Sequence, residues 1–219
     1  MKNRSWKTIR AKTLLLQPNR LLQRLYPRAI WRSDSREKNI YLTFDDGPVP
    51  LTGWVLDQLL LHEAKATFFC VGDNILRHPE IFERIKNEGH FIANHTMHHV
   101  KGFRLTTREY LEEVEACEKL TGTGFFRPPY GQLRASQYRA LLKRNYRIVM
   151  WDVISYDYEN ITPQRCLDNV LGNFREGSII LFHDNSKAEN NLKMTLPQVL
   201  LHLKQKDFQF KTLNYSEKN

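Results

Sequence analysis

Short apolar runs alternate with amphipathic segments along most of this 219-residue chain. The runs are rich in Ile, Val, Phe and Thr, as buried strands are, and the segments between them repeat apolar residues with helical spacing. Strands that alternate with helices pair in parallel through right-handed crossovers, so the pattern predicts an α/β sheet or barrel. We expect strands at 40–46, 66–71, 90–93, 124–127, 147–153, 178–182 and 208–213, and helices at 54–63, 79–88, 106–120, 135–145, 163–176 and 195–206.

Charge divides the chain into two parts. Residues 1–33 contain nine Lys and Arg residues and no Asp or Glu, which leaves 24 basic and 24 acidic residues at 34–219. The chain is 41% hydrophobic and 26% charged, which is ordinary for a globular protein, and 34–219 is long enough for one substantial core. We therefore predict a basic amphipathic arm at 1–33 and one folded domain at 34–219.

The basic arm has two interpretations. Its leucines among arginines are typical of an interfacial helix drawn to anionic lipid, which would give residues 1–33 a peripheral membrane contact. Alternatively, the apolar residues of 20–31 pack on the domain while the basic ones stay in water. The neutral domain and the absence of an aromatic platform argue against nucleic acid as a partner.

The arm shows no sign of an export signal. Its three leucines at 14–16 are followed by Gln17-Pro18, so the apolar run is too short for a secretory signal or a spanning helix. The three cysteines are odd in number and show no pairing or metal spacing. These features predict a cytoplasmic protein, peripheral to the inner membrane if the arm binds lipid, and they leave the oligomeric state open.

Polar residues stand at the carboxyl ends of the predicted strands. Parallel barrels and open α/β sheets gather their functional sites at this edge. Charges scattered for solubility would not select one end of the strands, so these residues predict a functional site. They are Asp45, Asp46, His95, His99, Arg127, Asp157 and His183.

Two motifs suggest a metal site. Asp45 and Asp46 are adjacent carboxylates, which repel one another unless a cation or a shared proton separates them. His95 and His99 are four residues apart, which would put both imidazoles on one face of a helical turn. Two imidazoles and one carboxylate suit Zn²⁺ in hydrolysis and also serve Fe²⁺. Taken alone, the first motif is more often a solvated turn and the second a surface helix.

Two later motifs suggest proton transfer and charge stabilisation. Residues 127–131 (RPPYG) follow a strand, where Arg127 would orient a site carboxylate while nearby backbone N–H groups face the substrate. A proline-rich bend is the alternative. His183-Asp184 follows an apolar strand and would supply a general acid, with a packed histidine as the alternative.

Together these segments resemble the polysaccharide deacetylase family, the nodulation-protein-B homology domain of carbohydrate esterase family 4. The resemblance covers about residues 38–213, and five motifs in the same order make it specific. The motifs are residues 43–48 (TFDDGP), 95–99 (HTMHH), 127–130 (RPPY), 151–158 (WDVISYDY) and 181–183 (LFH).

The resemblance implies a distorted (β/α) barrel of about seven parallel strands. It also implies a metal-dependent hydrolase that removes N-acetyl groups from N-acetylhexosamine units of a glycan, either peptidoglycan or a chitin-like oligosaccharide. Asp46, His95 and His99 would bind the divalent metal. Zn²⁺ is the first choice, with Co²⁺, Ni²⁺ or Fe²⁺ as alternatives.

The other motif residues take roles from the same resemblance. Asp45 would be the general base, paired with Arg127. His183 would protonate the leaving amine, with Asp157 tuning it. The backbone N–H of Tyr130 would help to hold the oxyanion.

Three further residues are expected to meet the carbohydrate substrate. Leu181 would line the pocket for the acetyl methyl group, and Pro128 and Tyr158 would contact the sugar. The family usually places Trp where this chain has Tyr158, and the tyrosine hydroxyl would change the apolar wall beside His183. This departure bears on substrate preference more than on the reaction.

Two other functions stay open from the sequence. The first is deacetylation of a small or lipid-linked amino sugar at the inner membrane face, which the basic arm would suit. The second is a catalytically silent carbohydrate-binding protein on the same fold. The presence of both Asp45 and His183 argues against the second, because a binding protein needs neither a base nor an acid.

Overall fold

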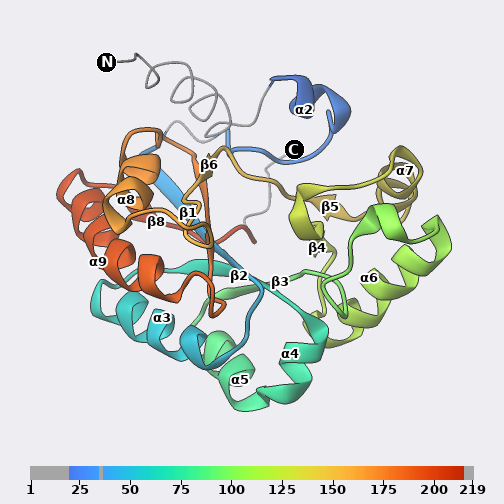
Figure 1. Cartoon of the computed structure of the whole chain (residues 1–219), viewed down its shortest axis with the longest axis horizontal. Helices are drawn as coiled ribbons and strands as arrows, with labels where there is room; N and C mark the ends of the chain where they lie inside the picture. The colour runs from blue at the N-terminus through green and yellow to red at the C-terminus, as the bar shows by residue number, and fades with distance from the viewer. Residues whose placement is uncertain (1–19, 35–36, 215–219) are drawn as a thin grey trace, which may run out of the picture.

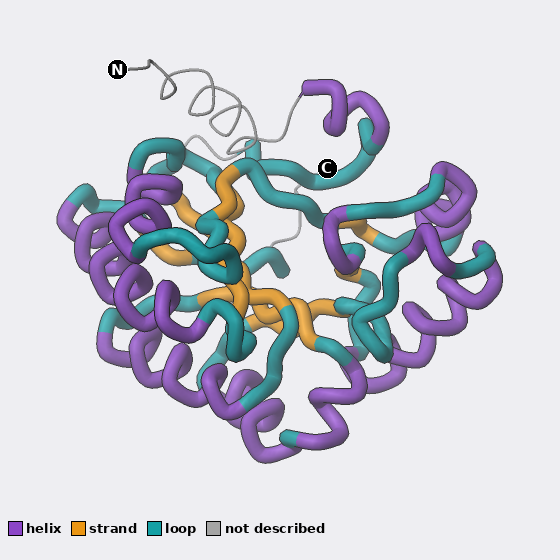
Figure 2. The backbone as a smooth tube through the Cα atoms, viewed as in Figure 1, coloured by secondary structure: helices purple, strands orange, loops and turns teal. Residues whose placement is uncertain are grey.

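The computed structural model describes residues 20–34 and 37–214. Figures 1 and 2 show strands at the centre of the molecule and helices around the outside. The strands are β1 (Asn39–Asp45), β2 (Ala66–Cys70), β3 (Phe91–Asn94), β4 (Phe125–Phe126), β5 (Arg147–Ile148), β6 (Val153–Ile154), β7 (Ile179–His183) and β8 (Gln209–Phe210). The helices are α2 (Arg20–Leu25), α3 (Pro50–Leu61), α4 (Gly72–Arg77), α5 (Pro79–Asn87), α6 (Thr107–Thr121), α7 (Ala135–Lys143), α8 (Pro163–Leu171) and α9 (Glu189–Gln205).

The strands form one curled parallel sheet. Their order is β5-β4-β3-β2-β1-β7-β6, and β8 pairs with the start of β1. The predicted α/β class and distorted barrel are therefore confirmed. The register places Asp45, the last residue of β1, opposite Phe69 of β2 and His183 of β7. Two of the predicted site residues thus lie side by side because adjacent parallel strands end together.

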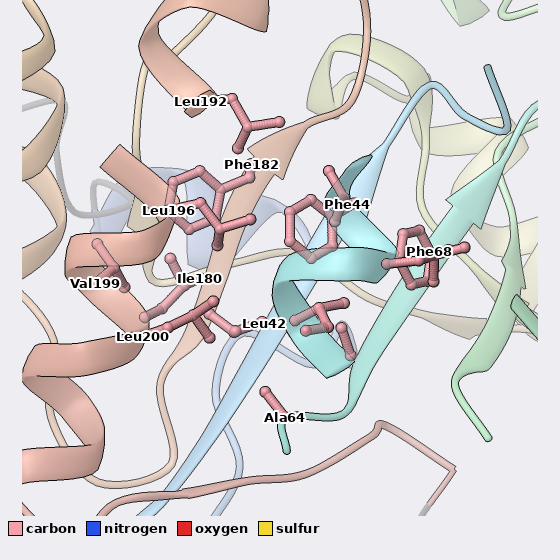
Figure 3. Packing of buried hydrophobic residues seen from close by; sticks show 14 of the residues in the cluster. Leu42, Phe44, Ala64, Phe68, Ile180, Phe182, Leu192, Leu196, Val199 and Leu200 are labelled. Atoms are coloured by element: carbon pink, nitrogen blue, oxygen red, sulfur yellow. The ribbon is translucent and has the colours of Figure 1, made fainter. Parts of the chain in front are cut away.

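The largest part of the core lies between the central strands and the helices that cover them. Figure 3 shows side chains of β1 and β7 facing those of α9, with Phe68 of β2 next to Phe44. The Phe44 ring lies 5.2 Å from that of Phe68 and 5.9 Å from that of Phe182. Burial of each such side chain contributes about 1.5–3 kcal/mol, so this layer makes the central strands a rigid base for the site.

Helix α6 shows how local sequence sets the limits of an element. Thr106 and Glu109 form a capping box, in which the Glu109 carboxylate accepts from Thr106 N–H and the Thr106 hydroxyl accepts from Glu109 N–H. Gly122 ends the helix in the left-handed conformation, with φ 66°. The helix predicted at 106–120 is confirmed.

The predicted strand at 147–153 is two strands in the structure. Its beginning, β5, pairs with β4, whereas its end, β6, pairs with β7 at the other edge of the sheet. The residues between them pair with the N-terminal segment, because Ile30 bridges Val149 and accepts a hydrogen bond from Met150 N–H at 2.7 Å. This split explains why the sheet has eight strands rather than about seven.

Helix α9 is longer than predicted. It begins at Glu189 and continues through Pro197, where the sequence suggested an interruption near the start. Leu192, Leu196 and Val199 are all fully buried, so one apolar stripe extends across the proline. Tertiary packing of this stripe outweighs the hydrogen bond that proline cannot make.

The N-terminal segment after α2 packs on the domain. Tyr26 is buried, and Ile30 and Trp31 pack against the core, while Arg24 and Arg28 are exposed. Figure 1 shows this segment crossing the side of the barrel between β6 and β5. Residues 26–31 therefore follow the second interpretation of the arm.

The predicted membrane contact falls mainly on residues 1–19, which lie outside the described residues, and it stays a prediction. Within the part of the chain that the structure describes, no helix has the length and apolar character needed to cross a bilayer.

Candidate active site

A cleft of about 600 Å³ opens at the carboxyl ends of the strands. Eight of the eleven predicted site residues line it, and Arg127 and Asp157 lie buried directly behind two of these. Pro128 is buried and does not line the cleft. The lining residues among those predicted are Asp45, Asp46, His95, His99, Tyr130, Tyr158, Leu181 and His183.

The two adjacent aspartates face different partners because the backbone turns between them. Asp45 ends the extended strand, whereas Asp46 has a left-handed conformation with φ 87°. Gly47 follows, where a Cβ atom would lie 2.3 Å from Asp184 Oδ2, so this position requires glycine. Asp184 accepts a hydrogen bond from the Thr52 hydroxyl at 2.6 Å, whereas His183 pairs with Asp157. Asp184 therefore holds the turn rather than the histidine.

His95 and His99 do not lie on a helical turn. The structure has an irregular loop here, with left-handed φ values at Thr96 (66°) and His99 (51°), so that part of the prediction is wrong. The loop is held from α6, where Glu113 O accepts from Met97 N–H at 3.0 Å. The two imidazoles still converge, with ring centroids 5.1 Å apart.

Asp46, His95 and His99 form the metal-capable group among the described residues. One ligand atom from each lies within 4.8 Å of the others. Asp46 Oδ1 is 3.0 Å from His99 Nε2 and 3.6 Å from His95 Nε2. The atom is buried and accepts no hydrogen bond of normal geometry from the described residues. A buried carboxylate oxygen without a hydrogen-bond donor is a favourable position for a bound cation.

The tautomer of His95 supports the same conclusion. Its Nδ1 lies 2.8 Å from Arg127 O, and a carbonyl oxygen can only accept, so Nδ1 carries the proton. In the neutral imidazole the lone pair then stands on Nε2, facing the carboxylates of Asp45 and Asp46. Lone pairs that face one another need a positive charge between them, and the donor set of two imidazoles and one carboxylate fits a divalent metal.

The pKa of Asp46 is well below its ordinary value. Burial alone would raise this pKa, but the imidazoles of His95 and His99 beside the carboxylate and the charge of His183 outweigh it. The carboxylate is therefore ionised at any working pH, as a metal ligand must be.

Arg127 is fully buried and fixes Asp45. Its Nη1 donates to Asp45 Oδ1 at 2.7 Å and to Thr43 Oγ1 at 2.8 Å, and its Nη2 donates to Met150 O at 2.9 Å. The guanidinium also lies 3.9 Å from the centroid of the Phe69 ring. These contacts hold one carboxylate oxygen of Asp45 and leave the other, Oδ2, toward His95.

Asp157 binds His183 by both of its oxygens. Oδ1 lies 2.9 Å from the ring Nδ1, and Oδ2 accepts from the backbone N–H of His183 at 2.8 Å. Burial lowers the pKa of His183, but the Asp157 carboxylate, with smaller contributions from Asp46 and Asp45, raises it to about 9. The imidazole is therefore protonated at neutral pH.

Aromatic side chains form the walls of the cleft. Tyr130 has a left-handed backbone conformation, with φ 61°, and its ring centroid lies 4.9 Å from that of His99. The Tyr158 ring meets the His183 ring edge-on, with centroids 4.6 Å apart. Burial raises the pKa of Tyr158, so its hydroxyl stays protonated. Gly131 lies against Trp151, where a Cβ would come within 2.7 Å of the ring.

Sequence reasoning missed several residues at the site. Asn185 donates from Nδ2 to Asp46 Oδ2 at 2.5 Å, and Asn74 Nδ2 donates to Asp46 O at 2.7 Å. His98 lines the cleft and pairs with Glu113 at 2.9 Å. The position of Asn185, two residues after a strand-end histidine, was the signal available for it.

Comparison with known proteins places the chain in a family. Residues 32–149 match the family model described as polysaccharide deacetylase. The chain belongs to the polysaccharide deacetylase family. The match covers more than half of the chain, and the site residues Asp157 and His183 lie beyond its end.

Members of the polysaccharide deacetylase family resemble the chain over most of its length. A peptidoglycan-N-acetylglucosamine deacetylase of Bacillus cereus is 37% identical over 182 residues, which cover 80% of this chain and 66% of that protein. A chitooligosaccharide deacetylase of Rhizobium leguminosarum bv. trifolii is 36% identical, over 74% of this chain and 79% of its own.

Solved structures of the family confirm the fold. The crystal structure of a peptidoglycan N-acetylglucosamine deacetylase, in complex with 4-naphthalen-1-yl-N-oxidanyl-benzamide, is similar with a TM-score of 0.79. It is 34% identical to this chain, and the match covers 85% of this chain and 91% of the other. The curled parallel sheet of this deacetylase fold is therefore common to both.

Proposed function

We propose that this chain is a metal-dependent hydrolase that removes N-acetyl groups from N-acetylhexosamine units of a glycan such as peptidoglycan or a chitin-like oligosaccharide. Family membership and the names of the relatives support this reaction. The observation that carries it is the placement of a carboxylate and a protonated imidazole beside one metal-capable group. Asp45 and His183 are register partners on β1 and β7, and Asp46 follows Asp45 directly.

Asp46, His95 and His99 would hold the metal, which we propose to be Zn²⁺. When bound, such a metal polarises the acetamide carbonyl and makes a water molecule more acidic. His95 donates its Nδ1 proton to a backbone carbonyl, which leaves Nε2 as the ring atom that faces the metal site, and Asp46 is ionised, as a metal ligand must be.

Asp45 would act as the general base. Arg127 holds Oδ1, so the carboxylate is fixed in one orientation and Oδ2 stays available to accept the proton of the attacking water. Four further contacts fix the guanidinium itself, so it holds Asp45 Oδ1 in a constant position.

His183 would act as the general acid. Amide nitrogen leaves readily only after protonation, and an imidazolium held by a carboxylate supplies the proton. Asp157 fixes the ring through Nδ1, which leaves Nε2 for the substrate. Leu181 and Tyr158 line the cleft, where we place the acetyl methyl group and the sugar, and the backbone N–H of Tyr130 would stabilise the oxyanion.

Acetate release tests the proposed function. The substrates are N-acetylglucosamine oligomers, peptidoglycan fragments, and nucleotide- or lipid-linked N-acetyl sugars, each assayed before chelation, after it and after Zn²⁺ is restored. We expect release from the glycan substrates that stops with chelator and returns with metal. Release only from lipid-linked sugars would instead support the small-substrate alternative.

A catalytically silent binding protein would behave differently. It would bind metal and glycan in stoichiometric amounts and release no acetate from any substrate in the panel. That result would contradict the proposed hydrolase.

A further inference from the structure

Asn185 joins the proposed metal ligand Asp46 to the start of α9. Its Nδ2 donates to Asp46 Oδ2 at 2.5 Å. Its Oδ1 accepts from the backbone N–H groups of Lys187 at 2.9 Å and Ala188 at 3.1 Å. One side chain therefore spans from the carboxylate to the turn that leads into the helix.

The orientation of the Asn185 amide follows from these partners. Backbone N–H groups only donate, so the atom that faces Lys187 and Ala188 must be the oxygen. The atom that faces the Asp46 carboxylate must then be the nitrogen. An amide flip would break three hydrogen bonds and set an oxygen against a carboxylate.

The contact makes the two oxygens of Asp46 unequal. Oδ2 is engaged by Asn185, whereas Oδ1 lies toward His95 and His99 and accepts no hydrogen bond of normal geometry from the described residues. The backbone of Asp46 is held separately, since Asn74 Nδ2 donates to its carbonyl oxygen at 2.7 Å. Two amides thus fix this residue, one at the main chain and one at the carboxylate.

We infer that Asn185 is a positioning residue that makes Asp46 a one-oxygen ligand of the metal. The inference rests on the metal site of the proposed function. A carboxylate held by one oxygen presents the other in a fixed direction and leaves more of the metal open to water and substrate. Without Asn185, Oδ2 is free to turn toward the metal as well.

Replacement of Asn185 by serine should remove the hydrogen bond to Asp46 and keep a side-chain acceptor for the turn that leads into α9. A serine hydroxyl can still accept from the backbone N–H groups that follow, as Ser does in such turns, but it is too short to reach Asp46. In Asn185→Ser we expect the metal dissociation constant to rise about 10–100-fold. We also expect the visible absorption of the Co²⁺-loaded protein to change, while the metal-free melting temperature stays within about 2 °C of the unsubstituted protein.

Asn173→Ser is the matched control. Its amide donates to Asn169 O at 2.8 Å, and Asn173 does not line the cleft, so metal affinity and the Co²⁺ spectrum should not change. Equal affinity and an unchanged spectrum in Asn185→Ser would overturn the inference, and so would weaker binding with an unchanged spectrum. Failure of the unsubstituted protein to bind Zn²⁺ or Co²⁺ more tightly than His99→Ala would overturn the proposed metal site itself.

Discussion

At the residue scale, the side chains of two neighbouring aspartates, Asp45 and Asp46, point to different partners because Asp46 has a left-handed backbone conformation. Asp45 keeps the strand conformation and points toward Arg127, whereas the left-handed Asp46 points toward the histidines. Asp tolerates this conformation better than most residues, since its short polar side chain can bond locally. Adjacent carboxylates can therefore take the two proposed roles, base and metal ligand, because Arg127 holds only Asp45 and His99 pairs only with Asp46.

Replacement of Asp45 by asparagine should remove the base and leave the metal ligands in place. We expect turnover to fall at least about 100-fold because asparagine cannot take a proton from water. Acetate release and metal affinity should be measured on the same preparation. His99→Ala is the reference that should lose both, and normal turnover by Asp45→Asn would remove the base assignment.

Replacement of Asp157 by asparagine should shift the pH profile. The carboxylate raises the pKa of His183 to about 9, so the acid stays protonated well above neutral pH. Without this charge the pKa falls, and the alkaline limb of the kcat profile should move to lower pH. A bound divalent cation opposes the contributions of Asp46 and Asp45 to the pKa of His183. The alkaline limbs of the unsubstituted protein and of Asp157→Asn should therefore be compared with both proteins fully loaded with metal. An unmoved alkaline limb would contradict the acid assignment.

The same pair predicts a pH-dependent stability. The folded pKa of His183, about 9, is above its ordinary value of 6.5, so the pair stabilises the fold fully below about pH 6.5 and loses this effect as pH rises through about 9. Urea unfolding of the metal-free protein should therefore show that Asp157→Asn costs more at about pH 6 than at about pH 10. An equal loss in the free energy of unfolding at the two pH values would contradict the assignment of His183 and Asp157 as an ion pair.

At the scale of elements, the loop that carries His95 and His99 depends on α6. The Glu113 carboxylate accepts from His98 N–H at 3.0 Å and pairs with the His98 ring at 2.9 Å, and its main-chain oxygen accepts from Met97 N–H. A loop without regular structure has few hydrogen bonds of its own, so a neighbouring helix has to supply them.

Glu113→Ala should loosen this loop and weaken metal binding. We expect a loss of several-fold in affinity, measured by chelator competition. This is less than the 10–100-fold that residues bonded directly to a ligand commonly contribute, because Glu113 contacts the loop residues Met97 and His98 rather than a ligand. Glu112→Ala is the matched control on the same helix, since Glu112 is exposed and contacts Arg108 at 3.6 Å. Equal affinities of the two variants would mean that α6 does not support the site.

At the scale of the whole molecule, the N-terminal segment completes the sheet and reaches the active site indirectly. Ile30 N–H donates to Ile148 O at 2.8 Å, and Met150 N–H donates to Ile30 O. Met150 O in turn accepts from Arg127, which holds Asp45. Residues before the matched family region are therefore part of the support for the base.

Tyr26→Ala should test this attachment. The buried Tyr26 hydroxyl donates to Leu133 O at 2.7 Å and accepts from Leu133 N–H at 3.0 Å, and its ring lies 5.1 Å from that of Tyr138. Loss of a buried aromatic ring should lower the free energy of unfolding by about 3 kcal/mol or more. Leu25→Ala, at a residue 62% exposed, should change it by less than about 0.5 kcal/mol. Equal effects in urea unfolding would show that the segment is not attached in solution.

The sequence by itself determined the α/β class and the edge of the sheet where the site lies. Buried strands and amphipathic helices differ in apolar period, and polar residues such as Asp45 and His183 at strand ends stand out against that pattern. The motifs therefore named eight residues that do line the cleft. Apolar periodicity and polar residues at strand ends are local signals, so they can be recognised in the sequence before the fold is known.

Only the tertiary structure decided how distant residues meet. The split of 147–153, the continuation of α9 through Pro197 and the non-helical path of 95–99 depend on neighbours far away in the chain. The same holds for Asn185, which reaches Asp46 across 139 residues of sequence. Hydrogen bonds and packing between distant segments leave no periodic trace in sequence, so their partners become known only when the chain is folded.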